Sequence, residues 1–124
     1  EKTLPPVEIS VTKGIYDTDA RLDPERIQHF CPVRSESLAA LGVDPAVARE
    51  ALERAALEVY TAYGCRDLAR IDFIWDGHHV LVMGLKTFPG LTETSLVPMA
   101  IEAAGYAVED VLAQLVEGAL KRGN

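Results

Sequence analysis

The clearest pattern of apolar and polar positions lies between Asp44 and Gly64. Apolar residues recur there at three- and four-residue spacing, which predicts an α-helix with one buried face. Asp44 and Pro45 suit its start, because an aspartate accepts the unpaired N–H groups of a first turn and proline fits the first helical position. Gly64 suits its end. Six residues are expected on the buried face: Ala48, Leu52, Ala55, Ala56, Val59 and Tyr63.

Two apolar runs after this helix predict a β-hairpin, because Leu68 to Trp75 and Val80 to Leu85 flank the turn pair Asp76-Gly77. Before the helix, Val7 to Val11 alternates β-branched residues and predicts a strand. Glycine, aspartate and proline interrupt the segment from Thr12 to Arg34, which is therefore predicted to be irregular.

Three further helices are predicted, at residues 35–41, 97–104 and 108–122. The order of strand, loop, helices, hairpin and two helices predicts an α+β fold, with a small, mostly antiparallel sheet and helices packed on one side. At 124 residues, the chain is expected to form a single domain spanning residues 1–124.

Composition narrows the range of partners. Nineteen acidic residues against twelve basic ones give a net charge of −7, and the sequence has no run of lysines and arginines. Both features argue against nucleic acid and anionic membranes as partners. No apolar run approaches the roughly 18 residues of a membrane span. Cys31 and Cys65 lack the spacing of a metal site and are typical of reduced thiols, which predicts a cytoplasmic location.

Two places in the sequence could carry chemistry. Arg70 and Asp72 share one face of a predicted strand, which is either the solvated face of a half-buried sheet or the wall of a cleft. In a cleft, the aspartate would bind a metal and the arginine would stabilise anionic oxygens. The second place is Thr87 to Pro98, which is either a connection with Thr94 or Ser95 capping the next helix, or an anion-binding helix start.

Six stretches in order along the chain resemble the C-terminal half of D-alanine–D-alanine ligases, which are members of the ATP-grasp superfamily. They are Glu8-Ile9, Tyr16 to Arg21, Phe30-Cys31-Pro32, Ala62 to Arg66, Ala69 to Phe73 and Thr87 to Pro98. The resemblance implies an ATP-grasp C-terminal-type lobe. It also implies peptide-bond formation through an acyl phosphate, with ATP and Mg²⁺ as cofactors and a small amino acid as substrate.

The resemblance also implies roles for individual residues. Arg70 matches the arginine that stabilises the tetrahedral intermediate, and Asp72 matches a metal-binding aspartate. Gly90 matches the backbone on the oxyanion side. Ser95 and Leu96 match the groups around the carboxylate of the second amino acid.

Four positions depart from the family pattern, and three of them concern the cofactors. Where the family has a glutamate that bridges two magnesium ions, this chain has Gly84, and where it has a metal-binding asparagine, this chain has Lys86. Arg21 stands in place of a lysine of the mobile loop, and we assign Arg21 and Lys86 to the cofactor side. One aspartate beside a lysine is a weak Mg²⁺ site.

These departures leave two interpretations open. In the first, the chain is half of an enzyme, and a longer chain or a partner supplies the lobe that the family has before Glu1. In the second, which the loss of metal ligands favours, it is a non-catalytic binding or scaffolding domain that pairs with the missing lobe or with a second copy. The chain is expected to be either a fragment of a longer protein or a stand-alone, degenerate C-terminal half.

A last expectation concerns Lys86. Without a metal ion, an ammonium group within about 4–6 Å would favour the ionised form of Asp72. We therefore expect Lys86 to contact Asp72, with Arg70 joining the pair. The alternative is a lysine that points into solvent.

Overall fold

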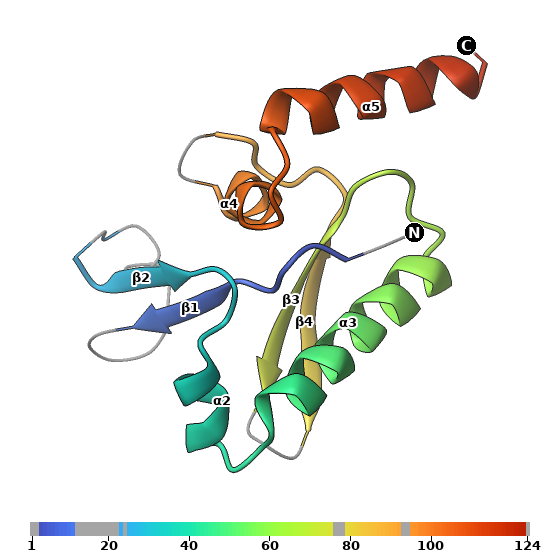
Figure 1. Ribbon diagram of the computed structural model, residues 1–124. Helices are drawn as coiled ribbons and strands as arrows, with labels where there is room; N and C mark the ends of the chain where they lie inside the picture. Colours follow the sequence, from blue (N-terminus) through green and yellow to red (C-terminus); the bar gives the residue numbers. More distant parts are fainter. Residues whose placement is uncertain (1–2, 12–22, 24, 76–78, 93–94, 124) are drawn as a thin grey trace.

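The computed structural model describes residues 3–11, 23, 25–75, 79–92 and 95–123, and Figure 1 shows their arrangement. Four strands and four helices lie in these ranges: β1 (Glu8–Val11), β2 (Ile27–Phe30), α2 (Ser35–Ala40), α3 (Pro45–Ala62), β3 (Arg70–Trp75), β4 (Val80–Lys86), α4 (Leu96–Ala103) and α5 (Val108–Lys121). The predicted α+β class is confirmed.

The described strands form two separate antiparallel pairs, β1 with β2 and β3 with β4, instead of the single small sheet that the sequence suggested. In the second pair, Arg70 lies opposite Lys86 and Asp72 lies opposite Gly84. The next residue of β3, Phe73, lies opposite Val82, so that Met83 is the extra residue of a β-bulge.

Strand β2 corrects the expectation of an irregular segment between residues 12 and 34. Gln28 and His29 at its centre are polar and exposed, so that the strand has no alternating pattern. Its backbone pairs with β1, with Val11 opposite Ile27 and Glu8 opposite Phe30. A pairing partner elsewhere in the chain, and not local propensity, makes this segment a strand.

Helix α3 begins where the sequence predicts. The Asp44 carboxylate accepts hydrogen bonds from the backbone N–H groups of Ala46 at 2.9 Å and Val47 at 3.2 Å. Pro45 occupies the first helical position, whose N–H group would have no partner within the helix. The helix ends before Gly64, which has a φ of 62° and therefore adopts the left-handed conformation that favours glycine.

The predicted buried face of α3 is confirmed only in part. Ala48 is fully buried, and the next four residues of the predicted face are half-buried. Tyr63, however, is 75% exposed. It follows the last helical residue, at the C-cap, so that it no longer continues the buried face.

Two small groups of buried side chains hold the elements together. Val33, Leu38 and Ala48 pack together, with Trp75 of β3 against them, and this cluster joins α2, α3 and β3. On α4, four residues are buried: Val97, Pro98, Ala100 and Ile101. The first cluster therefore packs the start of α3 against the end of β3, while α4 contributes a second centre of packing.

Helix α5 lies beside α4 at the upper end of the molecule in Figure 1. None of its described residues is fully buried. Arg122, just after its last turn, donates two hydrogen bonds to the Asp67 carboxylate, at 2.8 and 2.5 Å. This ion pair links the end of the helix to the loop before β3. In the described part of the chain, no helix combines the length and the apolar character needed to cross a membrane.

Candidate functional site

Arg70 and Asp72 form a two-pronged ion pair on one face of β3. The Arg70 Nε donates to Asp72 Oδ1 at 2.9 Å, and its Nη2 donates to Oδ2 at 3.0 Å. The two side chains are 22% and 41% exposed. The expectation that they share a face is confirmed, and the planar guanidinium engages both carboxylate oxygens.

Gly84 brings β4 close to this pair. It lies opposite Asp72, and a Cβ atom placed on Gly84 would lie 4.0 Å from Asp72 Oδ2, which is an ordinary contact distance. Position 84 therefore faces the Asp72 carboxylate. A glutamate there would place a second carboxylate beside the first, but glycine contributes none.

Lys86, the last residue of β4, lies opposite Arg70 in the same strand pair. Among the described residues, no hydrogen bond or ion pair joins Lys86 to Asp72, so the expected contact is wrong. Arg70 sits two positions from Asp72 on the same strand, where its fork-shaped group reaches both oxygens. A lysine offers a single point of charge and does not displace such a pair.

Thr92 and Ser95 contact each other between β4 and α4. The Thr92 N–H donates to Ser95 Oγ at 3.2 Å, and the two hydroxyl oxygens lie 2.6 Å apart. The Ser95 N–H donates to the Thr92 carbonyl oxygen at 3.0 Å. Ser95 occupies the N-cap position of α4, but its side chain makes no capping hydrogen bond. The predicted capping role is therefore wrong for Ser95, and Thr94 lies outside the described residues.

Gly90 is held against Ser95. A Cβ atom on Gly90 would lie only 2.8 Å from Ser95 Oγ, which is too close for real atoms. Any side chain at this position would push the Ser95 hydroxyl away from Thr92. The structure thus brings together Gly90 and Ser95, two of the residues singled out in the sequence, and Leu96 follows as the first residue of α4. Arg21 lies outside the described residues.

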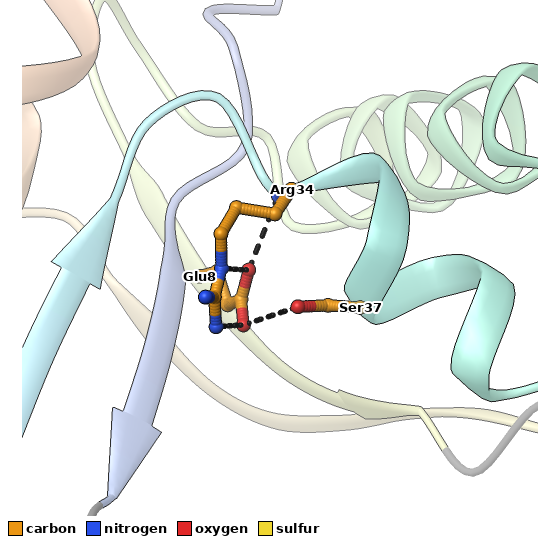
Figure 2. A network of polar contacts seen from close by, with 3 residues as sticks. All are labelled: Glu8, Arg34 and Ser37. Carbon is orange, nitrogen blue, oxygen red and sulfur yellow. Dashed lines mark hydrogen bonds and ion pairs between the residues drawn. The ribbon is translucent and has the colours of Figure 1, made fainter.

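Figure 2 shows a second polar network, which no pattern in the sequence predicted. The Glu8 carboxylate accepts hydrogen bonds from the backbone N–H of Arg34 at 3.1 Å, from its Nε at 3.2 Å and from its Nη2 at 2.9 Å. The Ser37 hydroxyl donates a fourth at 2.8 Å. The Arg34 guanidinium also stacks 3.6 Å from the centre of the Phe30 ring. No local motif indicates this contact, because Glu8 and Arg34 are 26 positions apart.

This network favours the ionised form of the Glu8 carboxyl. Hydrogen bonds from the Arg34 side chain, with smaller contributions from its backbone N–H and from Ser37, lower the pKa of the Glu8 carboxyl, against the opposing effect of burial. The carboxylate is thus held ionised and fully engaged. The network ties β1 to the start of α2 and leaves no free oxygen for a ligand.

Comparison with known proteins identifies the fold. A sequence profile described as "D-ala D-ala ligase C-terminus" matches residues 1–117. The chain belongs to this family. It is 36% identical over 124 residues to the D-alanine–D-alanine ligase of Desulforudis audaxviator, covering 98% of this chain and 37% of that protein. It is 34% identical over 119 residues to that of Pelotomaculum thermopropionicum, covering 95% and 35%.

Solved structures of D-alanine–D-alanine ligases have the same fold in the matched region. The D-alanine–D-alanine ligase from Bacillus anthracis, complexed with ATP, superposes with a TM-score of 0.68 at 28% sequence identity. The match covers 95% of this chain and 36% of that one. The chain therefore spans little more than a third of the length of the relatives it matches.

The residues of this ligase lobe do not fit the magnesium ions that the family implies. Within the described ranges, no three histidines, cysteines, aspartates or glutamates gather around one point. Both oxygens of Asp72 are engaged by Arg70, and position 84 carries no side chain. Lys86 adds a positive charge to the same end of the hairpin. Because Mg²⁺ needs several oxygen ligands, this donor set is a poor site for it.

Proposed function

We propose that this chain is the nucleotide-side lobe of a D-alanine–D-alanine ligase-like protein and that it has lost metal-dependent catalysis. The observation that carries the proposal is the Arg70–Asp72 ion pair opposite Gly84. Both oxygens of the Asp72 carboxylate are bonded to Arg70, and position 84 supplies no second carboxylate. Because phosphoryl transfer relies on positioning and charge stabilisation, the loss of the bridging ions should lower the rate by orders of magnitude. A cytoplasmic location remains a prediction from the composition.

Parts of the ligase machinery are retained, which supports a common ancestry of the site. ATP would supply the activation of a carboxylate as an acyl phosphate. Arg70 carries a charge that could stabilise an anionic oxygen there. The start of α4, directly after Ser95, presents backbone N–H groups that could hold the carboxylate of a small amino acid.

A hybrid ligase tests this proposal. Its first two-thirds come from the D-alanine–D-alanine ligase of Desulforudis audaxviator, and this chain replaces the matching third. We expect no ATP-dependent formation of D-alanyl-D-alanine and no phosphate release. The double variant Gly84→Glu, Lys86→Asn should restore both, because it supplies two oxygen ligands beside Asp72.

One outcome would contradict the proposal, and a second measurement would show how much of the metal site has been lost. Product formed by the hybrid with the unaltered chain, and abolished by Asp72→Asn, would show that the site is active as it stands. Calorimetry on the double variant of the chain is the second measurement. If that variant binds no Mg²⁺, more of the site than positions 84 and 86 has been lost.

An alternative is a non-catalytic binding or scaffolding domain that pairs with another chain. An open apolar groove between α3 and β4 favours it, with Leu81, Val82 and Met83 nearby at 54%, 47% and 61% exposure. A missing ATP-grasp lobe or a second copy of the chain would cover such a surface. Sedimentation distinguishes these cases: a monomer at high concentration excludes the homodimer, and added N-terminal lobe should then form a complex.

A further inference from the structure

The Arg70 end of the β3–β4 pair carries an unbalanced positive charge. Arg70 and Lys86 lie directly opposite each other, and side chains opposite each other on two strands are about 5 Å apart at their Cβ atoms. Like charges in this arrangement repel. Asp72 compensates one of the two, and the geometry shows which, because both of its oxygens are bonded to Arg70.

Lys86 is the cation left over. It is half-buried, and no carboxylate of the described residues forms an ion pair with it. Asp72 and Lys86 are the charged neighbours of Arg70 on these two strands, so the local sum is one positive charge. A half-buried ammonium beside a second cation is stabilised by an anion that enters from solvent.

The same arrangement disfavours the binding of a divalent cation. To bind at Asp72, it would have to displace the guanidinium from two hydrogen bonds of 2.9 and 3.0 Å and then lie near the Lys86 ammonium. An anion needs neither change, because Lys86 has no ion-pair partner among the described residues and Asp72 uses only two of the five N–H donors of Arg70.

We propose that Arg70 and Lys86 bind the phosphate groups of a nucleotide directly. The Lys86 ammonium then screens the negative charge of the phosphates in place of a metal ion. This inference rests on the proposed function, which assigns a nucleotide to this lobe. It makes phosphate binding independent of Mg²⁺. Magnesium in solution then weakens binding, because it competes for the same phosphate oxygens.

The test is a titration of the 124-residue chain with inorganic tripolyphosphate and, separately, with ATP. Backbone amide shifts of β3 and β4 are followed by NMR, in EDTA and in excess Mg²⁺. We expect both probes to shift these amides in EDTA, and Mg²⁺ to reduce the affinity. Lys86→Gln should weaken binding about tenfold or more, as expected for the loss of a charge-assisted hydrogen bond. Lys121→Gln removes the same charge from the exposed end of α5 and should leave binding unchanged.

The outcomes separate the two proposals. Binding that requires Mg²⁺, or that Lys86→Gln leaves intact, overturns the inference while the assignment of a nucleotide to this lobe stands. Binding of tripolyphosphate in EDTA without binding of ATP would overturn the nucleotide as the ligand in both proposals and leave only a phosphate site at Arg70 and Lys86. If neither probe shifts β3 or β4 in either condition, both proposals fail. Unchanged amide dispersion of Lys86→Gln confirms that the variant is folded.

Discussion

Glu8 and Asp72 are each held by an arginine through paired hydrogen bonds, yet their surroundings differ. Glu8 accepts four hydrogen bonds from Arg34 and Ser37, and its side chain is 16% exposed. Asp72 accepts two, both from Arg70 as far as the described residues go, and its side chain is 41% exposed.

The difference shows that an arginine–carboxylate pair does not by itself define a role. Around Glu8, every donor comes from segments that pack together, so that the pair fastens β1 to α2. Around Asp72, the pair lies at the open end of a hairpin, opposite a lysine for which the described residues supply no carboxylate partner. The first arrangement serves stability, and the second leaves charge available for a ligand.

The largest effect on stability is expected at Glu8. Replacing it by glutamine weakens the bonds to Arg34 and Ser37, and we expect a loss of about 1–2 kcal/mol in the free energy of unfolding, kept modest because water reaches part of the pair. Urea denaturation at pH 7 measures it. The matched control is Glu50→Gln, which breaks the exposed pair with Arg54 on α3 and should cost about 0.3–0.5 kcal/mol. Equal losses in the two variants would contradict the comparison.

The pH dependence of stability follows from the same carboxylate. Arg34 lowers the pKa of Glu8 in the folded chain below the ordinary 4.5, so the stabilisation is complete above pH 4.5 and is lost as the pH falls through the lower folded value. The difference in unfolding free energy between the wild type and Glu8→Gln should therefore be constant from neutral pH down to about pH 5.5 and shrink below 4.5. A difference that grows on acidification would contradict this assignment.

A smaller effect is expected at Asp72. Asp72→Asn breaks the ion pair and leaves Arg70 and Lys86 as opposed cations, but the site is exposed enough for water to screen them. We expect a loss below about 1 kcal/mol, measured in the same denaturation series. A loss as large as that of Glu8→Gln would mean that Asp72 is as enclosed as Glu8.

The smallest effect, and one of opposite sign, is expected at Lys86. Lys86→Gln removes the repulsion from Arg70, so stability should stay the same or rise by up to about 0.5 kcal/mol. High salt, which screens this repulsion, should abolish any gain. A clear destabilisation would indicate that Lys86 has an acidic partner in solution, as the sequence had suggested.

The sequence by itself determined the elements whose signals are local. Asp44 and Pro45 start α3, and Gly64 ends it, because capping bonds and the left-handed conformation involve residues a few positions apart. The β3–β4 hairpin follows from two apolar runs that flank a turn pair, and the shared face of Arg70 and Asp72 follows from alternation along one strand. The family motifs, read in order, predicted the fold that the comparisons bear out.

Only the tertiary structure decided the contacts between distant segments. Strand β2 exists because β1 lies beside it, and Glu8 meets Arg34 across 26 positions. Among the described residues, Asp72 pairs with Arg70 and not with Lys86, which lies opposite Arg70 on the neighbouring strand; the guanidinium fork matches the carboxylate, and an ammonium does not. A side chain at position 90 would displace the Ser95 hydroxyl, because the fold of the loop brings Ser95 against Gly90. Such outcomes depend on distances between side chains, which a one-dimensional pattern of residue types does not contain.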